Sequence, residues 1–236
     1  MDELALFQTS GIFLWRFVHY VAGVIWIGLL YYFNFVQMPF FAEADAATKS
    51  SATQKLVPRA LWWFRWAALI TFISGLMQLG ITAKASPAKW DIFLTSWGVL
   101  ILIGSLFGTL MFLNVWLVIW PNQKIVIGSA QSVAGGGAAD PRAANAATRA
   151  MLASRTNAAF SIPMLFFMGA ASHLPLVVGD AANFMGLWIA MFLIAGAMEI
   201  YALIGKPWGP YKSVGGILGW GFGLCAVVYF VSEMML

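Results

Sequence analysis

The chain contains several uninterrupted apolar stretches of about 20 residues, and these stretches constrain its fold more than any other feature. A helix of about 20 apolar residues is long enough to cross the hydrocarbon core of a bilayer. Of the 236 residues, 61% are hydrophobic and only 9% are charged, whereas a soluble domain has about 25% charged residues. We therefore predict an all-α integral membrane protein with a single transmembrane domain over residues 1–236.

Six stretches qualify as membrane spans. They run from about Gly11 to Val36, Leu61 to Thr82, Ile92 to Ile119, Ala158 to Val178, Ala182 to Ile204, and Gly215 to Met235. No charged start followed by a short apolar run and a cleavage site is visible, so we expect the first span to be retained.

The connections between the spans are polar. We expect a loop over Ala42–Pro58, an end of the third span at Pro121, and a long cytoplasmic loop over residues 122–156. The middle of this long loop, Ala134–Ala139, is rich in glycine and alanine. Its flanks are candidates for short helices, at Gln123–Gln131 and Arg142–Ser154.

Basic residues are distributed unequally between the two sets of loops. Ten lie in or beside the first, third and fifth loops, and two lie in the others. The ten are Lys49, Lys55, Arg59, Arg65, Lys124, Arg142, Arg149, Arg155, Lys206 and Lys212, and the two are Lys84 and Lys89. Because cytoplasmic loops carry an excess of Lys and Arg, we expect both termini on the outer side, in the periplasm if the membrane is the inner membrane of a bacterium.

The chain has two histidines, and both fall in the outer half of the predicted membrane domain. His19 lies about 12 Å below the outer end of the first span, and His173 about 8 Å below the outer end of the fourth. Gly23 and Gly169 each lie one turn from a histidine, where small residues would leave room for a flat macrocycle. Arg16 lies one turn from His19, towards the outer surface.

Imidazole is a common axial ligand of haem iron, and a haem propionate requires a cation. The spacing therefore predicts one b-type haem between the first and fourth spans, with His19 and His173 as iron ligands and Arg16 near a propionate. The alternative is that each histidine hydrogen-bonds to a neighbouring helix and binds no cofactor.

A second set of polar residues gathers near the cytoplasmic ends of the spans. It comprises Asn34, Gln37, Arg65, Asn114, Asn157 and Glu199. A buried carboxylate needs a partner, and Arg65 is the only cation at the depth of Glu199, so we expect an ion pair between them. This pair either holds the helices in register or contributes, with Asn157, to a pocket for a small polar substrate or to a proton path.

Small residues in two spans favour close helix packing. Gly104 and Gly108 form a GxxxG pair in the third span, and the sixth span contains several glycines that suit contact with another subunit. The single cysteine, Cys225, excludes an internal disulfide and a c-type haem attachment. No nucleic-acid-binding module is visible.

Three stretches, taken together, resemble the membrane domain of bacterial membrane-bound urate oxidases. They read RFVHYVAGVIWIG from Arg16, LWWFRWAALITFISG from Leu61, and GTLMFLNVWLVIWPNQKIV from Gly108, the last continuing through RTNAAFSIPMLFFM from Arg155 to SHLP. The first stretch also resembles membrane proteins of the copper-resistance D type and the protoporphyrinogen oxidase J type. In the latter group the histidine is a haem ligand, which implies the same role for His19.

The resemblance is incomplete near the cytoplasmic side. A His-Asn-Asn-Tyr stretch of the family corresponds to Thr156–Ala159, an acidic residue corresponds to Ala67, and a neighbouring histidine corresponds to Trp62. A Gly-rich segment before the second span and a C-terminal cytochrome c domain have no counterpart in residues 1–236. These departures argue against urate as the substrate.

Two functions are consistent with these features. One is a redox protein that passes electrons from its haem to a periplasmic cytochrome c or to other membrane subunits, with Arg65, Asn157 and Glu199 as candidate catalytic residues. The other is a non-catalytic accessory subunit of a larger respiratory, photosynthetic or oxygenase complex. A small-solute transporter is a weaker alternative, because few charged residues lie inside the spans.

Overall fold

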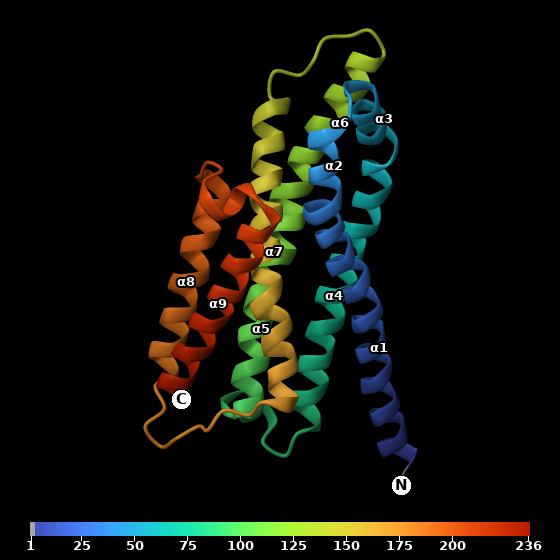
Figure 1. The fold of residues 1–236 in the computed structure, drawn as a ribbon. Coiled ribbons are helices and arrows are strands. Elements are labelled where there is room, and N and C mark those ends of the chain that lie inside the picture. The colour runs from blue at the N-terminus through green and yellow to red at the C-terminus, as the bar shows by residue number, and fades with distance from the viewer. Residues whose placement is uncertain (1–2) are drawn as a thin grey trace.

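The computed structural model describes residues 3–236 and is built from long helices (Figure 1). Helices account for 86% of the chain, and the described residues contain no strand. The predicted all-α class is therefore confirmed. The α-helices are α1 (Glu3–Tyr31), α2 (Met38–Glu43), α3 (Ala46–Lys55), α4 (Val57–Ala85), α5 (Ser96–Leu113), α6 (Trp120–Ala134), α7 (Ala143–His173), α8 (Phe184–Ile204) and α9 (Val214–Met235).

Four further helical segments join these helices. Two are π-helical, η1 (Tyr32–Gln37) and η3 (Asn114–Ile119), and two are 3₁₀ segments, η2 (Lys89–Leu94) and η4 (Gly209–Lys212). The first π segment makes α1, η1 and α2 one continuous helix. The second does the same for α5, η3 and α6.

Five helical stretches are long and apolar enough to cross a membrane. They are 11–43, 57–85, 96–134, 184–204 and 214–235. The 31-residue α7 is not among them, because buried polar residues such as Thr156 and Asn157 interrupt its apolar run. The number of apolar stretches nevertheless identifies a multi-pass membrane protein.

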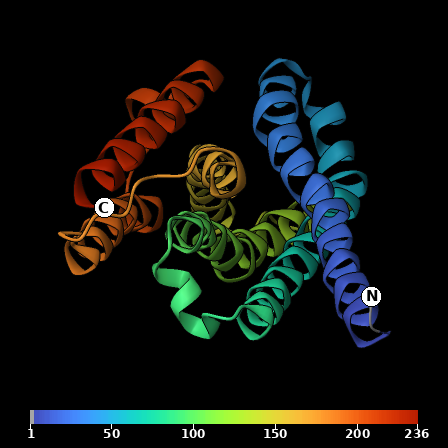
Figure 2. The same ribbon diagram turned by 90° about the horizontal axis from the view of Figure 1, so that it is seen from below.

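The α7 helix lies at the centre of the bundle (Figure 2). It packs against α5, α6, α8 and α9, and it meets α1 over a shorter contact. Its buried side chains include Phe160 and Phe167, which have no exposed surface. The α1 helix packs mainly on α4, and the two chain ends lie towards the same end of the bundle (Figure 1).

Two local predictions about the first and third connections are wrong. The segment Ala42–Pro58 is not a loop throughout, because it contains α3, whose N-terminus is capped by Asp45. One carboxylate oxygen of Asp45 accepts a hydrogen bond from the backbone N–H of Thr48 at 2.9 Å, and the other accepts from the hydroxyl of Thr48. These two bonds hold the pKa of Asp45 below its usual value. Likewise, Pro121 does not end the third span, because the helix continues to Ala134.

The π segments explain how proline enters these long helices. Each π segment ends two residues before a proline, with Gln37 preceding Pro39 and Ile119 preceding Pro121. Proline lacks a backbone N–H and collides with the carbonyl four residues earlier in a regular α-helix. The residue before each proline instead donates its N–H five residues back, as Trp120 does to the carbonyl of Val115. The wider turn lets the helix continue past the proline.

The long connection before α7 is shorter than predicted. Its predicted flanks are helical, but each flank continues a long helix, so only residues 135–142 lie between α6 and α7. At the other end, α7 stops at His173 and not near Val178, and the backbone of Leu174 is no longer helical. His173 is therefore the last residue of its helix, closer to the helix end than the sequence indicates.

Glycines allow two helices to approach α7 closely. A Cβ atom on Gly104 in α5 would lie 3.2 Å from the Cγ of Met168, so the predicted GxxxG pair does serve helix packing. A Cβ atom on Gly221 in α9 would lie only 2.6 Å from the Cδ1 of Ile162 and 3.0 Å from the carbonyl oxygen of Ala159. By contrast, a Cβ atom on Gly219 would meet nothing within 4 Å.

We expect Gly221→Ala to destabilise the α7–α9 contact, because the added methyl group would overlap both Ile162 and the backbone of Ala159. Overpacking of this kind costs about 1–3 kcal/mol. The measurement is the thermal unfolding midpoint of the detergent-solubilised protein. Gly219→Ala is the matched control on the same helix, and we expect it to be neutral or slightly stabilising, because alanine favours helix over glycine. Equal midpoints for the two variants would contradict the packing described here.

Candidate functional site

His19 is held against α4 by its imidazole ring. Its Nδ1 lies 2.9 Å from the carbonyl oxygen of Thr71 and 3.2 Å from the Oγ of Ser74. A carbonyl oxygen only accepts hydrogen bonds, so Nδ1 carries the proton in the neutral ring and Nε2 keeps its lone pair. Gly75 makes room for the ring, since a Cβ atom there would lie 3.2 Å from the Cε1 of His19.

The two neighbours of His19 on α1 have different environments. Arg16 is exposed. Gly23 faces α4, because a Cβ atom on it would lie 3.8 Å from the Cγ2 of Thr71. The space that we expected Gly23 to leave for a macrocycle is therefore occupied on this side by Thr71.

His173 and Gly169 lie on an exposed face of α7. Both residues are exposed, and a Cβ atom on Gly169 would meet nothing within 4 Å. Within the described residues, no hydrogen bond or ion pair is recorded for the His173 ring, and none joins it to His19. The structure thus presents His173 at the end of α7 without connecting the two histidines.

The two histidines nevertheless lie at matching positions along antiparallel helices. The Oη of Tyr31 on α1 and the Oγ of Ser161 on α7 form a hydrogen bond of 2.9 Å. His19 precedes Tyr31 by 12 residues, and His173 follows Ser161 by 12 residues. At 1.5 Å per residue, each histidine lies about 18 Å along its helix from this bond, towards the same end of the bundle (Figure 1).

These positions fit part of a haem site. The oriented ring of His19, with Nε2 unprotonated, has the form of an axial ligand whose other nitrogen is fixed by a hydrogen bond. Gly169 and His173 leave open surface on α7, whereas Gly23 does not leave any towards α4. Among residues 3–236, no group of three His, Cys, Asp or Glu side chains could hold a metal ion by itself.

The second set of predicted residues forms a buried network around Asn114. The Nδ2 of Asn114 donates to the Oδ1 of Asn157 and to the Oε2 of Glu199, both at 2.9 Å. Asn157 in turn donates to the carbonyl oxygen of Met111 at 2.9 Å. Asn114 and Asn157 are 1% and 0% exposed. The structure therefore brings Asn157 and Glu199 together through Asn114, which bonds to both and was not among the candidate catalytic residues.

The same face of α7 also binds the first span. Asn34, in the π segment η1, donates to the Oγ of Ser154 at 2.8 Å, one turn from Asn157. On another face, the hydroxyl groups of Thr156 and Tyr211 lie 3.0 Å apart. The side-chain oxygens of Asn34 and Asn114 have no hydrogen-bond partner. Asn34 and Asn114 each bond to a side chain of α7, and Asn114 also bonds to Glu199 on α8.

The predicted ion pair between Arg65 and Glu199 does not form. The guanidinium carbon of Arg65 lies 3.9 Å from the centroid of the Trp120 ring, which is a cation–π contact. In the described part of the chain, the only ion pair joins Asp140 and Arg142. The carboxylate of Glu199 is stabilised by an amide donor, and Arg65 by an aromatic face, so the two residues belong to different groups of side chains.

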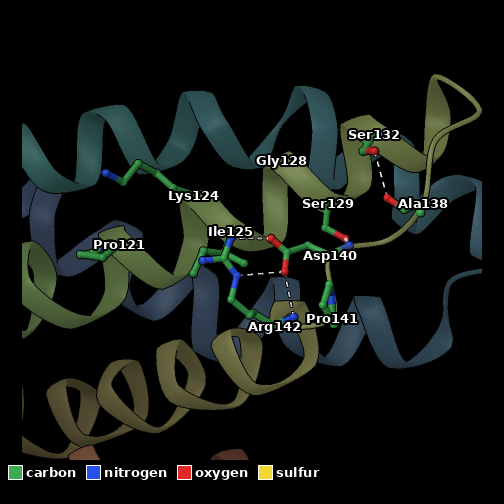
Figure 3. Close-up of a pocket in the computed structure, with 10 residues that line it drawn as sticks. All are labelled: Pro121, Lys124, Ile125, Gly128, Ser129, Ser132, Ala138, Asp140, Pro141 and Arg142. Atoms are coloured by element: carbon green, nitrogen blue, oxygen red, sulfur yellow. Dashed lines mark hydrogen bonds and ion pairs between the residues drawn. The ribbon is translucent and has the colours of Figure 1, made fainter.

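A pocket lies away from both sets of residues. It has a volume of about 820 Å³ and lies between α6 and the segment that leads into α7 (Figure 3). Most of its polar groups are already paired: Ser129 accepts from the N–H of Asp140, and Ser132 donates to the carbonyl oxygen of Ala138. Arg142 binds Asp140 at 2.8 Å and lowers the pKa of its carboxyl group to about 2. This cavity contains none of the predicted site residues.

Comparison with known proteins gives one match. The family model described as urate oxidase N-terminal matches residues 80–207, which is more than half of the chain. The matched part contains Asn114, Asn157, His173 and Glu199, whereas His19 and Arg65 precede it. No curated protein and no solved structure matches.

A double-mutant cycle distinguishes the observed partner of Glu199 from the predicted one. We expect the variants Asn114→Ala and Glu199→Ala to show a coupling energy of about 0.5–3 kcal/mol, because residues that share a hydrogen bond are not additive. Arg65→Gln and Glu199→Ala should be additive within about 0.5 kcal/mol. Chemical unfolding of the solubilised protein supplies the free energies. A larger coupling energy of Glu199 with Arg65 than with Asn114 would contradict this and support the predicted ion pair.

Proposed function

This chain belongs to the urate oxidase N-terminal family, and we propose that it is a membrane redox protein with one b-type haem between α1 and α7. When bound, haem supplies a one-electron carrier. In this proposal electrons pass to a cytochrome or a partner complex on the outer side of the membrane. His19 and His173 would ligate the iron, Arg16 would lie near a propionate, and Gly169 would leave room for the macrocycle.

The orientation of His19 is the observation that carries this proposal. The bond from Nδ1 to the carbonyl of Thr71 and the close contact with Gly75 hold the ring in one position. A histidine that ligates a metal normally donates its other ring N–H in this way. The matching distances of His19 and His173 from the bond between Tyr31 and Ser161 support the choice of His173 as the second ligand.

We further propose that α7 is a sixth span and that both termini lie outside. The positions of the two chain ends, towards the same end of the bundle, support an even number of crossings (Figure 1). The excess of basic residues in the first, third and fifth connections supports a cytoplasmic location for the opposite end. In this proposal the membrane is the inner membrane of a bacterium.

A second candidate function is that of an accessory subunit in a larger membrane complex. The closed packing around Asn114 and Asn157 favours it, since a catalytic pocket must admit a substrate and these side chains are buried and bonded to each other. The separation of Arg65 from Asn157 and Glu199 favours it as well. An accessory subunit can retain a haem, so the two functions are compatible.

The haem proposal is tested by His19→Ala. We expect the variant to lose the b-type signal in a reduced-minus-oxidised spectrum, with haem content measured as the pyridine haemochrome, because the variant lacks an axial ligand. Ser74→Ala is the matched control: it removes the more distant partner of Nδ1 and leaves the bond to Thr71, so haem content should remain near that of the parent. Full haem occupancy in His19→Ala would disprove the assignment.

The orientation of the chain in the membrane is tested by labelling in spheroplasts of a bacterial host. In a Cys225→Ala background, we expect a membrane-impermeant maleimide to react with Lys84→Cys, because that position is exposed and is assigned to the outer side. Lys212→Cys, also exposed, should react only after the membrane is opened. Labelling of Lys212→Cys but not of Lys84→Cys in intact spheroplasts would show that both termini lie on the cytoplasmic side.

A further inference from the structure

Two cations share one indole ring where the long helix α5–η3–α6 leaves its apolar run. The guanidinium of Arg65 lies 3.9 Å from the centroid of the Trp120 ring, and the Nζ of Lys124 lies 5.6 Å from it. Arg65 comes from α4, and Trp120 and Lys124 from α6. We call these three residues the cationic indole cluster.

Neither cation in this cluster is neutralised by a carboxylate. The one ion pair in the described part of the chain joins Asp140 and Arg142. Lys124 is exposed, and its side chain extends away from that pair (Figure 3). Both cations lie within 6 Å of the centroid of one ring, so an anion that binds beside this ring would interact favourably with both charges.

Two partly exposed tryptophans lie near Arg65 along α4. Trp62 lies one turn before Arg65 and is 46% exposed, and Trp66 is 38% exposed. Trp66 in turn packs edge-on against Trp116, with ring centroids 5.5 Å apart. Tryptophan side chains concentrate at the level of lipid headgroups, where one part of the ring is in apolar surroundings and the N–H group reaches polar ones.

The position along the helix agrees with this level. Lys124 is the first charged residue of the stretch 96–134 and follows Ser96 by 28 residues, or about 42 Å of helix, which exceeds the hydrocarbon thickness of about 30 Å. A soluble anion would not require an apolar rim of tryptophans, whereas a phospholipid presents a phosphate and an apolar glycerol–acyl region to the same site. Basic pockets between membrane helices are suited to such headgroups.

We propose that the cationic indole cluster binds the phosphate of an anionic phospholipid headgroup. Arg65 and Lys124 contact the phosphate oxygens, and Trp62 and Trp66 contact the adjoining apolar part of the lipid. This role does not depend on the haem, and it assigns Arg65 to the surface of the protein and not to the network of Glu199.

The test uses native mass spectrometry of the full chain in detergent, with phosphatidylglycerol and with phosphatidylcholine of the same acyl chains as probes. We expect preferential binding of phosphatidylglycerol, and a loss of about fivefold in its affinity for each of Arg65→Gln and Lys124→Gln. Lys84→Gln is the matched control, since Lys84 is an exposed cation at the other end of α4. Lys124→Arg keeps the charge and should keep the affinity.

Three results would overturn the proposal. One is equal binding of the two lipids, and another is an equal loss of affinity in Lys84→Gln and Lys124→Gln. The third is displacement of the lipid by millimolar inorganic phosphate, because it would assign the cluster to a soluble phosphate. If Arg65→Gln does not fold, Lys124→Gln alone decides, since Lys124 is exposed and its replacement leaves the packing intact.

Discussion

Polar side chains buried in α7 determine which helices can surround it. A bilayer core offers no water to bond a polar group, so a hydrogen bond within the protein stabilises a buried polar side chain. Ser154 pairs with Asn34, Asn157 with Asn114, and Ser161 with Tyr31. These three bonds connect α7 to the first and third long helices at successive turns. Apolar packing alone would allow those helices to slide or rotate, and the bonds select one arrangement.

Much of the fold follows from the sequence because membrane helices leave a strong signal. A long apolar run without charges has few alternatives to a helix, and the limits of α4, α8 and α9 lie within a few residues of the predicted spans, α4 extending slightly further at each end. The wrong predictions are those in which a local feature of the structure overrides the usual effect of a residue type. Proline normally ends a helix, but Pro121 follows a π segment, and nothing in the preceding residues signals such a segment. In the same way α3 is a polar helix, recognisable only from the cap at Asp45.

The candidate sites were predicted less completely than the fold. Sequence position gives the approximate depth of a residue along its helix, and the structure does bring Asn114, Asn157 and Glu199 together. It does not give the direction in which a side chain points. Arg65 turns towards Trp120, and Glu199 towards Asn114. A similar predicted depth for an arginine and a glutamate therefore did not imply a contact between them.

The π segment at Asn114–Ile119 has a consequence for how this helix tolerates change. Relative to a regular α-helix, a π turn accommodates about one additional residue. Insertion of a further residue just before Trp120, with no second π turn to absorb it, would rotate every later side chain by about 100°. Asn114 would still face α7, but Trp120 would leave Arg65. One long helix thus presents its two halves to different neighbours, and its length in residues, as much as their identity, is under constraint.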